Sequence, residues 1–175
     1  MRNKKENIAL IGMPGSGKST VGKILADRLG YEFYDTDELI EKTSGKSIAE
    51  IFEEGETVFR LMEASVCEEL SKDFGKVIST GGGVAKSREN MEVLRQGSLV
   101  IFLERDIESI ARDIDFSIRP LLKDGIISLK KLHEERVDLY RQYSHITVDA
   151  NCSKEETVKK IITITQEREY ENTCD

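Results

Sequence analysis

Short apolar segments alternate with longer amphipathic segments along this chain. The short segments are rich in residues that favour strands, which are β-branched or aromatic, whereas the longer ones repeat their apolar residues every three to four positions, as helices do. Such an alternation of strands and helices is typical of an α/β fold with a largely parallel sheet. The predicted strands are residues 8–11, 32–34, 77–79, 99–103 and 145–148.

Local signals predict where several helices begin and end. Gly30 is expected to end the helix after the first strand, because glycine readily adopts the left-handed conformation of a helix C-cap. Two motifs, SIAE at 47–50 and SKEE at 153–156, have the spacing of capping boxes and predict helix starts. Two long helices are expected, at about 56–73 and about 129–143.

The remaining segments are less regular. Residues 113–125 have no clean period and are predicted to form an excursion from the sheet. The polar residues from about 169 to 175 are expected to fray. At 175 residues, the chain is long enough to bury a core without disulfides or metals, so we expect one domain spanning 1–175.

Composition narrows the class of protein. The 26 basic residues against 33 acidic ones give a net charge of −7, which argues against a dedicated nucleic-acid binder. No apolar run is long enough to cross a bilayer, and the N-terminus lacks the apolar core of a secretory signal. Three scattered cysteines and two histidines favour neither a disulfide framework nor a zinc site. We expect a cytoplasmic monomer without membrane or nucleic-acid partners.

A glycine-rich loop follows the first predicted strand. Gly12-x-x-x-x-Gly17-Lys18-Ser19 meets the full pattern of a P-loop, with a strand before it and a helix after it. Its backbone N–H groups would surround an anion, Lys18 would reach the β- and γ-phosphates, and the Ser19 hydroxyl would ligate Mg²⁺. An ordinary glycine-rich turn is the alternative. The loop predicts a nucleotide as phosphate donor and leaves the acceptor open.

Two aspartates follow the second predicted strand. Asp35 and Asp37 are expected at the carboxyl edge of the sheet, where the P-loop also lies and where ligands of such sheets bind. One would hold metal-bound water, and the other would accept a proton or a hydrogen bond from a hydroxyl group. The alternative is that Asp37 only caps a helix over 38–43.

A glycine triplet, Gly81 to Gly83, follows the third predicted strand, where a backbone without Cβ atoms lets a small polar ligand approach the amides. A flexible turn is the alternative. The arginines are harder to interpret from their positions alone. Arg60 is placed to pair with Glu63 on a helix surface, and Arg141 to complement the dipole at a helix end.

Taken in order, these motifs resemble the shikimate kinase family. They are GMPGSGKST at 12–20, FYDTDELI at 33–40, the FR of Phe59 and Arg60 with Glu63, STGGG at 79–83, IRPLL at 118–122 and LYR at 139–141. The resemblance implies a three-layer αβα P-loop kinase fold with a central five-stranded parallel sheet and a mobile lid at about 113–125. It also implies ATP- and Mg²⁺-dependent phosphorylation of the 3-hydroxyl of shikimate, which gives 3-phosphoshikimate and ADP in the biosynthesis of chorismate and the aromatic amino acids.

The same resemblance implies roles for individual residues. Shikimate, which carries a carboxylate and ring hydroxyls, would be bound by Asp37, Arg60, Gly82, Gly83 and Arg141. ATP would be bound by Gly15, Ser16, Gly17, Lys18, Ser19, Thr20, Arg112 and Arg119, the last from the lid. Mg²⁺ would be held by Ser19 and, through water, by Asp35. The expected catalytic residues are Lys18, Asp37 and Arg119.

Two other functions share part of this pattern. Another small-metabolite kinase of the P-loop class, such as a gluconate kinase, would have the P-loop, so the DTD, FRxxE, GGG and LYR motifs discriminate between the two. A catalytically silent kinase-like module would bind nucleotide or a partner without turnover. Such modules usually lose the lysine, an aspartate or an arginine that this chain keeps.

Overall fold

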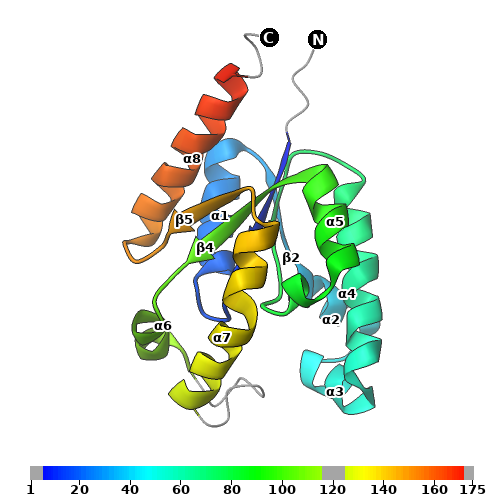
Figure 1. Cartoon of the computed structure of the whole chain (residues 1–175). Helices are drawn as coiled ribbons and strands as arrows, with labels where there is room; N and C mark the ends of the chain where they lie inside the picture. Colours follow the sequence, from blue (N-terminus) through cyan, green and yellow to red (C-terminus); the bar gives the residue numbers. More distant parts are fainter. Residues whose placement is uncertain (1–5, 116–124, 172–175) are drawn as a thin grey trace.

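The computed structural model describes residues 6–115 and 125–171 and has a sheet of five parallel strands at its centre (Figure 1). The order across the sheet is β2-β3-β1-β4-β5. The predicted strands are confirmed, with ends that shift by one residue. They are β1 (Asn7–Ile11), β2 (Glu32–Asp35), β3 (Lys76–Ser79), β4 (Ser98–Glu104) and β5 (Ile146–Asp149).

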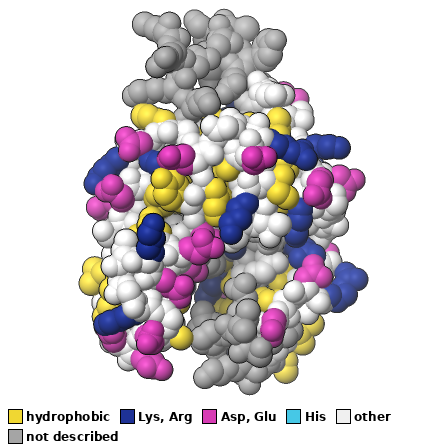
Figure 2. All heavy atoms as spheres, turned by 180° about the vertical axis from the view of Figure 1, so that it is seen from behind, with side chains coloured by type: hydrophobic (Ala, Val, Ile, Leu, Met, Phe, Trp, Pro, Cys, Tyr) yellow, Lys and Arg dark blue, Asp and Glu magenta, His cyan; other side chains and the backbone are white. Residues whose placement is uncertain are grey.

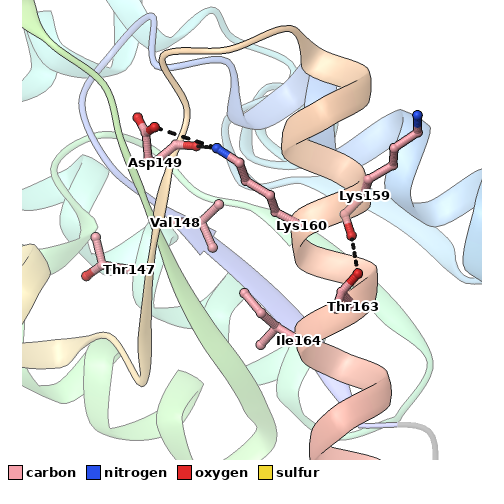
Figure 3. Close-up of a pocket in the computed structure, with 7 residues that line it drawn as sticks. All are labelled: Thr147, Val148, Asp149, Lys159, Lys160, Thr163 and Ile164. Atoms are coloured by element: carbon pink, nitrogen blue, oxygen red, sulfur yellow. Dashed lines mark hydrogen bonds and ion pairs between the residues drawn. The ribbon is translucent and has the colours of Figure 1, made fainter.

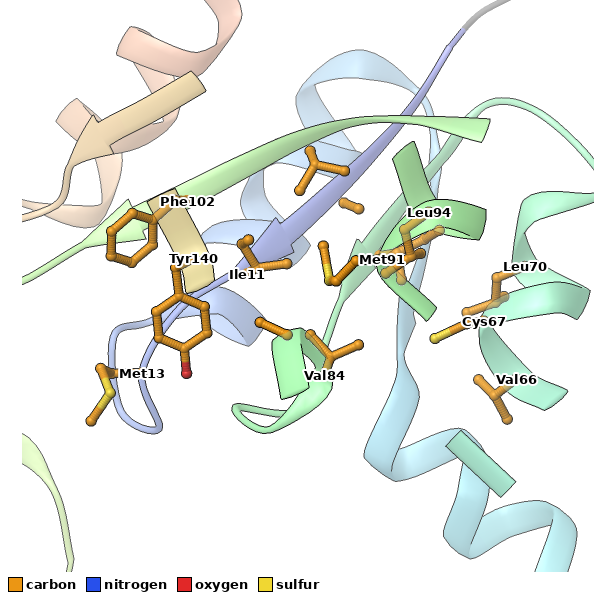
Figure 4. Packing of buried hydrophobic residues seen from close by; sticks show 14 of the residues in the cluster. Ile11, Met13, Val66, Cys67, Leu70, Val84, Met91, Leu94, Phe102 and Tyr140 are labelled. Atoms are coloured by element: carbon orange, nitrogen blue, oxygen red, sulfur yellow. The ribbon is translucent and has the colours of Figure 1, made fainter. Parts of the chain in front are cut away.

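The central strands bury side chains on both faces, as parallel sheets do. Along β1, Ile8 and Leu10 belong to one hydrophobic cluster, whereas Ala9 and Ile11 belong to the other, because successive side chains of a strand point to opposite faces. Helices α1 and α8 pack on the first face, and α4, α5 and α7 cover the second (Figures 1 and 4). The three-layer αβα architecture is therefore confirmed.

The described helices connect the strands in the order that the sequence predicted. They are α1 (Lys18–Leu29), α2 (Thr36–Ser44), α3 (Ile48–Glu54), α4 (Glu56–Ser71), α5 (Arg88–Gly97), α6 (Ile107–Asp113), α7 (Ile126–Tyr143) and α8 (Lys154–Glu171), with a 3-10 turn, η1 (Val84–Lys86), after β3. The two long helices predicted at 56–73 and 129–143 correspond to α4 and α7. Helix α7 begins three residues earlier than expected, at Ile126.

The predicted caps are also confirmed. Gly30 ends α1 in the left-handed conformation, with φ of 64°. Ser47 accepts a hydrogen bond from the Glu50 N–H at the start of α3, and the Glu50 carboxylate accepts one from the Ser47 N–H. The same reciprocal pair joins Ser153 and Glu156 at the start of α8. Short polar motifs thus determine where these helices begin.

Part of the predicted lid, residues 116–124 with Arg119, lies outside the described residues. Before it, α6 ends at Asp113, and beyond it α8 continues to Glu171, three residues into the tail that was expected to fray. Acidic and basic side chains are mixed over the face shown in Figure 2. Within the described ranges, none of the helices has an apolar stretch that would span a bilayer.

Candidate active site

The P-loop connects β1 to α1 at the carboxyl edge of the sheet. Gly12, Gly15 and Gly17 have φ values of 145°, 78° and 99°, which side chains other than glycine rarely adopt. A Cβ on Gly12 would lie 2.8 Å from the carbonyl oxygen of Leu103 in β4, so the loop also packs too closely for a larger residue. The glycines of the motif are therefore required by the backbone shape of the loop.

Lys18 lies inside this loop and is 7% exposed. Its Nζ donates to the carbonyl oxygens of Gly12 and Met13, each over 2.8 Å. Ser16 is buried beside it, whereas Thr20 is exposed on the first turn of α1. The Lys18 ammonium group is thus hydrogen-bonded to carbonyl oxygens of the loop. It is placed to exchange these hydrogen bonds for contacts with a bound anion.

Ser19 and Asp35 meet where α1 and β2 approach each other. The Ser19 hydroxyl donates to Asp35 Oδ2 over 2.7 Å and lies 3.2 Å from the Ser79 hydroxyl. Hydroxyl and carboxylate oxygens are the ligands that Mg²⁺ prefers, together with water and substrate phosphates. No cluster of three or more His, Cys, Asp or Glu side chains suited to a metal occurs among the described residues. The oxygen pair fits a Mg²⁺ ion that a nucleotide helps to bind.

The residue that caps the next helix is Asp35 and not Asp37. Asp35 Oδ1 accepts from the N–H groups of Asp37 and Glu38, at 3.1 and 3.4 Å. The alternative role considered for Asp37, as the cap of a helix over 38–43, is therefore wrong. Since helix α2 already begins at Thr36, Asp37 lies in its first turn, and its side chain points towards the glycine triplet.

The glycine triplet brings three parts of the chain together. A Cβ on Gly81 would lie 2.8 Å from Asp37 Oδ1, and one on Gly83 would lie 2.6 Å from Arg60 Nη2. A Cβ on Gly82 would lie 2.8 Å from Pro14 Cδ in the P-loop. None of these glycines has a positive φ, so their backbone shape is open to other residues and close packing is what excludes a side chain.

Arg60 pairs with Glu63, as its helical spacing predicted, but the pair is not a solvated surface bridge. Arg60 Nη1 donates to Glu63 Oε2 over 2.8 Å, and the Glu63 side chain is fully buried. Burial raises the pKa of Glu63, and the nearby Arg60 charge opposes that rise. Glu56 accepts from the other side of the guanidinium, at 3.1 Å from Nη2. These two carboxylates hold the guanidinium against Gly83.

Arg136 is a residue of this site that the sequence analysis missed. It lies on α7, is 4% exposed, and its Nη1 donates to the Gly82 carbonyl oxygen over 3.0 Å. Tyr140, one turn later, donates its hydroxyl to the same oxygen and packs on Phe102, with ring centroids 5.1 Å apart (Figure 4). Burial raises the pKa of Tyr140 to about 12. The available signal was an arginine in the apolar stripe of α7 between Leu129 and Tyr140.

The structure does not bring Arg141 to the glycine triplet. Arg141 follows Arg136 by five positions, which corresponds to about 140° around an α-helix. Its side chain is 55% exposed and pairs with Glu104, with Nη2 2.6 Å from Oε1, and more loosely with Asp138. The arginine of α7 that lies beside Gly82 is therefore Arg136, which corrects the expectation for Arg141.

Arg112 lies on α6, on the exposed side of that helix. It donates to the Glu108 carbonyl oxygen and the Ser109 hydroxyl, so its contacts are local. Gly15 in the P-loop packs against Ile110 and Ile114 of the same region. The adenine contact expected of Arg112 stays a prediction.

A hollow of about 560 Å³ lies on the far edge of the sheet, between β5 and α8 (Figure 3). Thr147, Asp149 and Lys160 are among its lining residues, and Lys160 Nζ donates to the Asp149 carbonyl oxygen over 3.0 Å. None of the predicted site residues lines it. The hollow is therefore separate from the candidate site at the P-loop edge.

Known proteins resemble this chain in sequence and in fold. The sequence model of one family, shikimate kinase, matches residues 14–166. A shikimate kinase of Clostridium botulinum is 47% identical over 161 residues, covering 90% of this chain and 98% of that protein. A structure of shikimate kinase from Acinetobacter baumannii in complex with shikimate has a TM-score of 0.89 and 36% identity, with 94% of each chain covered. A gluconokinase from Sinorhizobium meliloti, at 16% identity and a TM-score of 0.54, shares the fold alone.

Proposed function

The chain belongs to the shikimate kinase family, and we propose that its P-loop edge transfers the terminal phosphoryl group of ATP directly to the 3-hydroxyl of shikimate. The chain is an enzyme that phosphorylates shikimate, and its family uses ATP as co-substrate. We further propose that it works as a cytoplasmic monomer. The observation that carries the proposed site is the convergence of Asp37, Arg60 and Arg136 on the glycine triplet beside the P-loop.

The acceptor half of the site suits a small hydroxylated carboxylate. Arg60 lies against Gly83 from helix α4, and Arg136 donates to Gly82 from helix α7. Two guanidinium groups at one site can bind a carboxylate through charge-assisted hydrogen bonds. Asp37, beside Gly81, is placed to accept a hydrogen bond from a ring hydroxyl. Shikimate has these groups, so we assign its carboxylate to the arginines and its reacting hydroxyl to Asp37.

The donor half consists of the P-loop and the residues around it. Lys18 would exchange its contacts with Gly12 and Met13 for the β- and γ-phosphates, and so neutralise charge that develops during transfer. Ser19 would hold Mg²⁺ directly and Asp35 through water, and the ion supplies further neutralisation of phosphate charge when bound. Arg119 lies outside the described residues, and its catalytic role in the lid is part of the proposal.

Asp37 orients the acceptor hydroxyl, and transfer proceeds in line without a phosphoenzyme. The transition state of such reactions is usually loose, so positioning and electrostatic stabilisation supply most of the rate. Catalysis then depends on the fixed positions of Asp37, Arg60 and Arg136 around the glycine triplet.

A coupled assay of ADP release, run with shikimate and gluconate in parallel, tests the proposed acceptor. We expect turnover with shikimate and only background ADP release with gluconate. Turnover with gluconate alone would overturn the proposal. Binding of ATP and shikimate by calorimetry without any turnover would instead support a catalytically silent module.

A further inference from the structure

A second lysine approaches the P-loop from outside the motif. Lys154 is the first residue of α8, and Figure 1 shows the start of α8 and helix α6 on the same side of the loop that precedes α1. A Cβ on Gly17 would lie 2.7 Å from Lys154 Nζ and 3.2 Å from its Cε. The end of the Lys154 side chain therefore lies directly against the phosphate-binding loop.

This ammonium group has no counter-ion in the described parts of the chain. Lys154 is partly buried, yet its ammonium group makes no hydrogen bond or ion pair within residues 6–115 and 125–171. Burial lowers the pKa of Lys154, and the positive charge of nearby Arg105 lowers it further, while Asp113 opposes both effects. A partly buried cation without a partner is costly, and an anion placed beside it removes that cost.

Arg105 explains why the nearby carboxylate does not neutralise Lys154. It follows β4, is 12% exposed on its side chain, and pairs with Asp113 at the end of α6. Its Nη1 also lies 3.4 Å from the carbonyl oxygen of Gly15 in the P-loop. The guanidinium thus engages Asp113 and fixes the end of α6 to the loop, which leaves Lys154 available to a ligand.

We propose that Lys154 is a phosphate ligand of the bound nucleotide, additional to Lys18, and that Arg105 is a positioning residue that keeps Asp113 away from it. This inference rests on the proposed function only for the identity of the nucleotide. Its geometric basis is the contact of Lys154 with Gly17 and of Arg105 with Gly15. In an acidic protein of net charge −7, these cations gather at the loop that must hold the most negative ligand.

Calorimetric titration of the full chain with ADP tests this role without the acceptor. We expect Lys154→Gln to weaken ADP binding by about 10-fold or more, as the loss of a charge-assisted contact does. Lys154→Arg should restore most of the affinity. The matched control is Lys159→Gln, which removes an exposed lysine of the same helix and should bind ADP as the wild type does.

Steady-state kinetics separate a ligand from a structural residue. Lys154→Gln should raise the KM for ATP and leave the KM for shikimate unchanged, whereas a general loss of structure would alter both. If Lys154 only covers an empty loop, Lys154→Gln will bind ADP as tightly as the wild type or more tightly, and that result would overturn the inference. Failure of the proposed function is distinguishable, because the wild type would then bind ADP but not turn over shikimate.

Discussion

Replacement of Arg136 by Met removes the buried guanidinium beside Gly82. Arg136 is 4% exposed and its Nη1 lies 3.0 Å from the Gly82 carbonyl oxygen, so it is fixed where the acceptor carboxylate is proposed to bind. A hydrogen bond to a charged group contributes about 1.5–3 kcal/mol. The KM for shikimate should therefore rise by about 10- to 150-fold. The KM for ATP should change little, because the P-loop contacts remain.

Two further variants make this prediction specific to Arg136. Arg136→Lys keeps the charge but loses the planar fork that binds a carboxylate at two points, so its KM should lie between those of the wild type and Arg136→Met. Arg141→Met removes the exposed arginine of the same helix, which pairs with Glu104 at the surface. That variant should keep the KM of the wild type, because exposed ion pairs contribute little.

The assay is the initial rate of ADP release at saturating ATP with shikimate varied. Circular dichroism of each variant verifies that it is folded. The reasoning would be refuted if Arg141→Met raised the KM for shikimate while Arg136→Met left it unchanged.

Three other predictions concern the glycine triplet, the proposed Mg²⁺ site and the stability of the fold. Gly83→Ala puts a Cβ 2.6 Å from Nη2 of Arg60 and displaces the guanidinium. The KM for shikimate should therefore rise by about 10-fold or more, and unchanged shikimate kinetics would contradict this reasoning from packing. Asp35→Asn keeps a side-chain oxygen to cap α2 but loses the negative charge beside Ser19. The Mg²⁺ concentration that gives half the maximal rate should therefore rise by about 10-fold or more. An unaltered Mg²⁺ dependence would exclude Asp35 from the metal site. The His145 ring accepts the Val100 N–H over 3.0 Å, and burial lowers its pKa in the folded state, with nearby positive charges adding to the effect. The unfolded chain therefore takes up this proton first, and the free energy of unfolding by urea should fall as the pH drops below about 6.5. His145→Asn should reduce that slope, and an identical slope in both proteins would contradict the assignment.

Most of the fold follows from local sequence patterns. Parallel strands favour short apolar segments with β-branched or aromatic residues, and the five segments of this kind form the sheet. Capping motifs at Ser47 and Ser153 determine helix starts through hydrogen bonds within four residues, so they are visible without a structure. The P-loop is equally local, because its glycines and Lys18 lie within the seven residues 12–18 and shape one loop.

The position of Arg136 beside the glycine triplet depends on packing across the molecule and was not predicted. Sequence spacing alone does not tell which face of α7 points to the sheet, and the LYR motif drew attention to Arg141 rather than Arg136. The decisive fact is the contact between Arg136 and Gly82, which are 54 residues apart in the chain. The same limit applies to Lys154, whose contact with Gly17 joins the start of the last helix to the loop after the first strand.

A crystal structure of the chain with shikimate and ADP tests the central claim most directly. We predict that the shikimate carboxylate lies between the guanidinium groups of Arg60 and Arg136, over Gly82 and Gly83. The 3-hydroxyl should lie within hydrogen-bonding distance of Asp37 and face the P-loop. Shikimate bound elsewhere, or a carboxylate held by Arg141, would contradict the account.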